Sequence, residues 1–131
     1  TQQSSSAASD VYKRQIIATN TTISRPQDLR DEYKDEEGGI SGQPLKELSN
    51  KVLSFLSKET NGELLLIGVG GISNAEDVYT KIKLGASLVQ LYTALTFNGP
   101  QMINNIKKDL SLLLQNDGYK SISDAVGIIH S

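Results

Sequence analysis

The sequence has 131 residues, with 13 Lys and Arg against 15 Asp and Glu, a single His, and neither Cys nor Trp. A net charge of −2 leaves no basic footprint for nucleic acid, so we expect no nucleic-acid partner. The lack of Cys excludes disulfides, thiolate zinc sites and a cysteine nucleophile within this chain, and the single His excludes a multi-histidine metal site. We therefore expect no metal.

The segment 1–15 differs from everything after it, because it is polar, rich in Ser and without helical or strand periodicity. A disordered natural terminus is one interpretation, and a signal peptide is excluded by the lack of an apolar segment after the charges. The stretch 5–15, SSAASDVYKRQ, resembles the in-frame translation of a sequencing adapter, which is the interpretation we favour. The natural part would then be 16–131, with its upstream sequence missing.

Three short apolar segments downstream predict β-strands, at 16–18, 64–69 and 87–92. Continuous rather than alternating apolarity is typical of parallel strands that are buried on both faces. Buried helices are the alternative, but such short segments, closed by glycine, favour strands.

The segment after Pro44 is predicted to be a helix, since proline is favoured in the first turn and Asn61-Gly62 supplies a stop. Apolar residues at helical spacing are expected to form its core face. These residues are Leu45, Leu48, Val52 and Leu56.

The ends of the further helices can be predicted from capping residues, glycine and proline. Ser73 and Glu76 form the pattern of a capping box, and Gly85 is expected to end that helix. Pro100 opens a longer helix, and 121–126 predict a short last one. The resulting order β-α-β-α-β-α predicts an α/β fold with parallel strands. Because three such units cannot close a barrel, we expect the chain to be part of a larger domain.

Donor groups follow two neighbouring predicted strands. Gly70 and Gly71 offer backbone N–H groups that an anion can approach closely, although a tight turn is the alternative interpretation. Tyr92 and Thr93 offer further donors, with an aromatic at the core edge as the alternative for Tyr92. Two adjacent strand ends without carboxylates match the phosphate site of many eight-stranded α/β barrels.

Polar side chains also follow the first strand. Asn20 and Thr21 supply donors and acceptors that suit a planar ligand with carbonyl and N–H groups, and capping of the strand end is the alternative. The Gly-rich loop 38–44 either folds over a ligand or simply connects two elements. His130 is interpreted as part of a frayed tail rather than as a ligand.

In this order, the motifs resemble class 2 dihydroorotate dehydrogenase, the quinone-dependent class. The stretches that carry the resemblance are 19–26 (TNTTISRP), 38–45 (GGISGQPL), 67–72 (IGVGGI) and 85–95 (GASLVQLYTAL). The resemblance covers 16–127, and it implies a (β/α)₈ TIM barrel that binds FMN. This chain would supply the last three βα units, the C-terminal portion of the FMN-binding domain.

The resemblance implies flavin contacts for six residues and pyrimidine contacts for two. The flavin residues would be Thr19, Gly42, Gly70, Gly71, Tyr92 and Thr93, and Asn20 and Thr21 would hydrogen-bond dihydroorotate or orotate.

Other family features have no counterpart here. In the family, a serine removes a proton from dihydroorotate opposite hydride transfer to the flavin, and this serine precedes the matched stretches. The helical region that forms the quinone tunnel and contacts the membrane also precedes them. Since Ser24, Ser41 and Ser73 are not expected to replace the base, we expect no catalytic residue in this chain and no activity from it alone.

The resemblance implies that the complete enzyme oxidises dihydroorotate to orotate and passes electrons through FMN to a quinone, in pyrimidine biosynthesis. It would associate with a membrane through the missing region, the mitochondrial inner membrane in a eukaryote or the cytoplasmic membrane in a bacterium. A partial barrel of another phosphate- or flavin-binding enzyme and a non-catalytic binding module are the alternatives.

Overall fold

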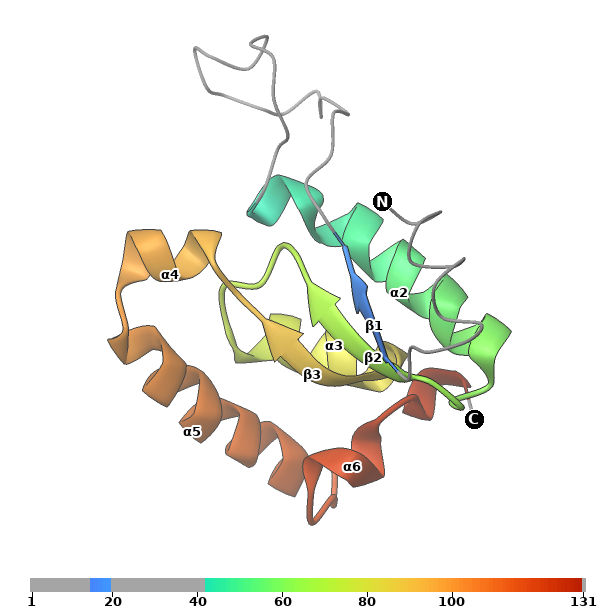
Figure 1. Cartoon of the computed structure of the whole chain (residues 1–131). Coiled ribbons are helices and arrows are strands. Elements are labelled where there is room, and N and C mark those ends of the chain that lie inside the picture. Colours follow the sequence, from blue (N-terminus) through green and yellow to red (C-terminus); the bar gives the residue numbers. More distant parts are fainter. Residues whose placement is uncertain (1–14, 20–41, 131) are drawn as a thin grey trace, which may run out of the picture.

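The computed structural model describes residues 15–19 and 42–130, which contain a three-stranded parallel sheet (Figure 1). The strands are β1 (Gln15–Ala18), β2 (Leu65–Val69) and β3 (Ala86–Gln90), in that order across the sheet. The predicted strands and their parallel arrangement are confirmed. β1 begins one residue before the expected start of the natural sequence, and β3 ends two residues earlier than predicted.

One face of the sheet is covered and the other is open. Helix α2 packs on β1 and β2, and α3 packs on β3. The buried cluster beneath α2 consists of Ile16, Leu53, Leu66 and Ala86. On the opposite face Ile17 is 50% exposed and Leu88 is 56% exposed. The prediction of strands buried on both faces therefore holds for the central strand β2, where Leu66 and Ile67 are both buried, and is wrong for β1 and β3, which are the edges of the described sheet.

The first predicted helix is confirmed, but its predicted core face is only partly correct, because Leu45 is buried and Leu56 packs on the core whereas Leu48 is exposed. A short 3₁₀ turn, η1 (Gln43–Leu45), leads into α2 (Lys46–Thr60), which ends at Asn61 with a φ of 50°. The buried residues lie four apart, at Leu45, Ser49, Leu53 and Ser57, whereas Leu48 is 42% exposed. The small serines let α2 lie close to its neighbours: a Cβ on Gly85 would meet the Cβ of Ser57 at 2.6 Å.

The helix α3 (Ala75–Leu84) is capped one residue later than predicted. Asn74 Oδ1 accepts the Asp77 N–H at 2.9 Å, and Asp77 Oδ2 accepts the Ser73 N–H at 3.1 Å. The predicted box of Ser73 with Glu76 is therefore wrong, because Asp77 is the carboxylate that reaches back to the start of the helix. Gly85 ends α3 as predicted, with a φ of 128°.

The C-terminal helices are α4 (Thr93–Asn98), α5 (Gln101–Asn116), α6 (Ile122–Ala125) and the 3₁₀ turn η2 (Ile128–His130). Of these, α5, α6 and η2 pack on α3, and α4 packs on α5 (Figure 1). The helices α5 and α6 were predicted, and α4 was not. A second core forms where α5 meets α3, and its members include Tyr79, Met102, Ile106, Leu110 and Leu114. In the described part of the chain, every helix is too short or too polar to cross a membrane.

His130 is docked, so its interpretation as a frayed tail is wrong. Its Nε2 lies 3.0 Å from the Leu84 carbonyl oxygen and 3.5 Å from Ser54 Oγ. These contacts join η2 to the end of α3 and to the middle of α2, because a carbonyl at a helix end is left without an intrahelical donor.

Candidate functional site

A hollow of about 290 Å³ lies at the carboxyl ends of the three strands. All six residues that the sequence placed at a flavin line it: Thr19, Gly42, Gly70, Gly71, Tyr92 and Thr93. Six further residues line it that were not predicted: Leu45, Val69, Ile72, Gln90, Leu91 and Ala94. Within the described residues the lining has no charged side chain. Asn20 and Thr21, the predicted pyrimidine contacts, lie outside the described residues, as does the loop at 38–41.

The turn after β2 builds one wall of the hollow from bare backbone. Gly70 has a φ of 109° and Gly71 a φ of 70°, so the tight-turn interpretation is correct. A Cβ on Gly71 would lie 2.6 Å from the backbone nitrogen of Lys46, and one on Gly70 would lie 2.8 Å from Leu45 Cδ2. The first turn of α2 therefore presses against the turn from behind and leaves room for glycine alone. A wall of this kind lets an anion approach backbone N–H groups closely.

The opposite wall comes from the loop before η1 and from the start of α4. A Cβ on Gly42, which has a φ of 76°, would lie 3.0 Å from Thr93 Cγ2. Gly42 and Thr93 therefore lie against one another although 50 residues separate them. Tyr92 is 81% exposed, so its alternative interpretation as a core-edge aromatic is wrong for the described residues.

Hydrogen bonds to one carbonyl hold the ends of β1 and β2 together. The Thr19 N–H donates to the Val69 oxygen at 3.1 Å, and the Ser49 hydroxyl donates to the same oxygen at 2.6 Å. Thr19 thus has a fixed position at the rim of the hollow, set from behind by α2.

A polar cluster ties the loop at Gly42 to the start of α3. Gln43 Nε2 donates to Asp77 Oδ2 at 3.2 Å and also to Ser73 Oγ, while Lys46 Nζ donates to Asp77 Oδ1 at 3.1 Å. Burial acts to raise the pKa of Asp77, but hydrogen bonds from Lys46 and Ser73 outweigh it and hold the pKa below its usual 3.8. The negative charge of Asp77 is therefore balanced by Lys46.

Sequence reasoning missed a buried cation behind the hollow. Lys81 is fully buried, and its Nζ donates to Ser49 Oγ and to Asn50 Oδ1, both at 2.8 Å. Burial lowers the pKa of Lys81 to about 8. A lysine within a helix is normally solvated; the available signal was its position on the same face as Val78 and Ile82, which are both buried.

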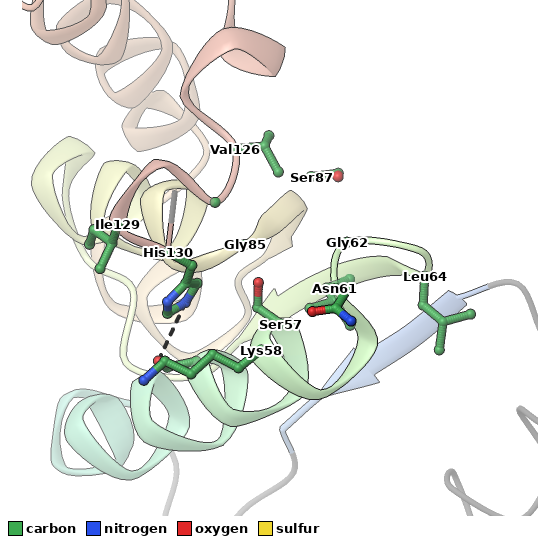
Figure 2. A pocket seen from close by; sticks show the side chains of 13 residues that line it. Ser57, Lys58, Asn61, Gly62, Leu64, Gly85, Ser87, Val126, Ile129 and His130 are labelled. Carbon is green, nitrogen blue, oxygen red and sulfur yellow. Dashed lines mark hydrogen bonds between the residues drawn. The ribbon is translucent and has the colours of Figure 1, made fainter.

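A larger hollow of about 820 Å³ lies at the other end of the strands (Figure 2). It is bounded by the end of α2, the residues before β2 and β3, and the docked His130. We assign the ligand site to the smaller hollow, because parallel α/β folds bind their ligands at the carboxyl ends of the strands. No group of three metal-ligating side chains occurs within the described residues.

Comparisons with known proteins agree on one family. The family model for dihydroorotate dehydrogenase matches residues 2–114, a range that includes most of the adapter-like segment, whose interpretation stays a prediction. Dihydroorotate dehydrogenase (quinone) of Xanthobacter autotrophicus is 51% identical over 113 residues, 86% of this chain and 32% of that protein. The mitochondrial mouse protein, also described as quinone-dependent, is 46% identical over 115 residues, 88% of this chain and 29% of that protein.

Solved structures give the same result. The crystal structure of the dihydroorotate dehydrogenase of Eimeria tenella with ferulenol has a TM-score of 0.90 and 40% identity, over 96% of this chain and 34% of that one. Its ligand-free form has a TM-score of 0.91 and 40% identity, over 97% and 35%. This chain thus spans about a third of the length of the proteins that it matches.

Proposed function

The chain belongs to the dihydroorotate dehydrogenase family, and from this premise we propose that it forms one wall of the FMN and substrate site of a quinone-dependent enzyme. The family is flavin-dependent, and its fold is a TIM barrel of which this chain is a part. The complete enzyme would oxidise dihydroorotate to orotate in pyrimidine biosynthesis.

The observation that carries the proposal is the convergence of residues from three strand ends on one hollow. Gly70, Gly71, Tyr92 and Thr93 would hold the FMN phosphate through backbone N–H groups. A wall of bare backbone fits a phosphate, because the space behind Gly71 excludes a side chain there. The described lining also has no carboxylate, so no negative charge repels a phosphate dianion. Thr19 and Gly42, which line the same hollow, would contact the flavin.

For the substrate, we propose that Asn20 and Thr21 hydrogen-bond the pyrimidine ring. They follow Thr19 directly, and Thr19 lies at the rim of the hollow. Bound FMN would supply the hydride acceptor. Residues 16–131 would orient the substrate and exclude water, while the proton would be removed by a base outside them.

Quinone reduction and membrane contact are proposed for the complete enzyme rather than for residues 16–131. The relatives are described as quinone-dependent, and the mouse relative is mitochondrial. A mitochondrial inner membrane location is therefore proposed for a eukaryotic source, and a cytoplasmic membrane location for a bacterial one. We also retain the proposal that 1–15 is adapter-derived.

The test uses the completed protein, defined as residues 16–131 joined to the upstream residues of their own gene. We expect the purified completed protein to release FMN on denaturation, in an amount stoichiometric with the chain. A matched Gly71→Ala variant should release little, because the added methyl group displaces the backbone wall. Release of no flavin, or of a different nucleotide, by the unmodified protein would contradict the proposal.

A further inference from the structure

The buried Lys81 is the one fully buried cation among the described residues, and neither of its hydrogen-bond acceptors is charged. Its aliphatic stem runs beneath β2, since a Cβ on Gly68 would lie 3.0 Å from Lys81 Cδ. An ammonium group placed among neutral partners is costly, because burial removes its hydration without supplying an opposite charge.

The ammonium lies directly behind the turn that lines the hollow. Its distance to Ser49 Oγ is 2.8 Å, and Ser49 Oγ is 3.2 Å from the position of a Cβ on Gly70. Lys81 Nζ is therefore within about 6 Å of the Cβ position on Gly70, on the side of the turn that faces α2. Ser49 also donates to the Val69 oxygen, which in turn accepts the Thr19 N–H. A short chain of hydrogen bonds thus connects Lys81 to two of the residues that line the site.

The charges around Lys81 do not cancel. In the described part of the chain, the charged groups that act on it are Asp77 from α3 and Lys46 from α2, while Gly68 of β2 lies against its aliphatic stem. Asp77 is paired with Lys46 at 3.1 Å, so one positive charge is left over. Burial lowers the pKa of Lys81 to about 8, as expected for a cation that still lacks an anion.

We propose that Lys81 is the buried counter-charge of the flavin phosphate, acting across the Gly70–Gly71 turn. The inference rests on the proposed function, because it assigns the phosphate to this hollow. Lys81 does not touch the ligand, so it is a positioning residue rather than a catalytic one. Its ammonium holds the turn in place through Ser49 and attracts the dianion through a medium that screens charge poorly.

The test compares two ligands that differ only in the phosphate. FMN and riboflavin are titrated into the apo form of the completed protein, and dissociation constants are measured by quenching of flavin fluorescence. We expect Lys81→Met to weaken FMN binding at least about tenfold and riboflavin binding less than about twofold. The matched control is Lys83→Met, on the same helix, whose ammonium lies 4.5 Å from the Tyr79 ring centroid. It should change neither constant more than about twofold.

A second arm needs no variant and decides the question if Lys81→Met fails to fold. Between about pH 7 and about pH 9 the unmodified protein should lose about fivefold in FMN affinity while its riboflavin affinity stays level, because the free protein loses the Lys81 proton in this range. Equal losses for both ligands in Lys81→Met, or an FMN affinity that does not change with pH, would overturn the inference. An unmodified protein that binds neither flavin would instead overturn the proposed function, and the inference with it.

Discussion

Lys46 Nζ lies 3.1 Å from Asp77 Oδ1, and this ion pair joins the first turn of α2 to the first turn of α3. The two turns meet behind Gly71, where Lys46 also supplies the backbone that excludes a side chain. The pair therefore holds the two helix starts together around the β2–α3 turn. Its strength bears on the shape of the proposed phosphate site as well as on stability.

Replacing Asp77 by Asn should lower the free energy of unfolding of the completed protein by about 1 kcal/mol, because the ion pair and a charged acceptor for the Ser73 N–H are lost. The folded-state pKa of Asp77 is below 3.8, so its stabilisation is present above about pH 4 and is lost as the pH falls through the folded pKa. Urea denaturation of both proteins at neutral and acidic pH measures this. Asp109→Asn, at an exposed position of α5, is the control, and an equal effect of the two variants would refute the assignment.

Replacing Gly71 by Ala should cost about 3 kcal/mol in unfolding free energy and abolish flavin retention, since strain at positive φ adds to a clash with the Lys46 backbone. Gly118→Ala separates the two contributions. Gly118 has a φ of 83° but no atom within 4 Å of an added Cβ, so this variant should cost about 1 kcal/mol and keep its flavin. Denaturation midpoints and flavin content check both values, and flavin retention by Gly71→Ala would argue against a backbone wall.

Replacing Asn20 by Ala in the completed protein should lower kcat/KM for dihydroorotate about tenfold or more, because buried hydrogen bonds to the pyrimidine are lost. FMN content should stay unchanged, which separates substrate binding from cofactor binding. The matched control is Asn104→Ala, which removes the same amide group at an exposed position of α5 and should leave kcat/KM unchanged. Unaltered kinetics for Asn20→Ala would exclude its proposed role.

The 131-residue chain by itself should aggregate and should melt without a sharp cooperative transition. The reason is the open sheet face, where Ile17 and Leu88 are at least half exposed, together with the unpaired edges of β1 and β3 in the described sheet. Light scattering and calorimetry provide the measurement. A monomer that unfolds in a single sharp transition would contradict this expectation.

The fold could be predicted from the sequence because the strands are continuous apolar segments and the helices carry legible ends such as Gly85 and Pro100. The buried face of α2 could not, since its contacts use Ser49 and Ser57, whose polarity is typical of a surface. Small size decides burial there, because helix and sheet approach too closely for larger side chains.

The candidate site could also be predicted only in part. Part of its lining could be predicted because parallel strands place their carboxyl ends at one edge, which brings Thr19, Gly70 and Thr93 together. Lys81 was missed although it shares a helix face with Val78 and Ile82, because a lysine side chain is usually solvated.

The most direct test of the account is the response of the completed protein's flavin to dihydroorotate in the absence of oxygen and quinone. We expect a yellow protein whose visible flavin absorbance bleaches on addition of dihydroorotate and returns on addition of a quinone. A colourless protein, or a yellow one whose absorbance dihydroorotate leaves unchanged, would contradict it.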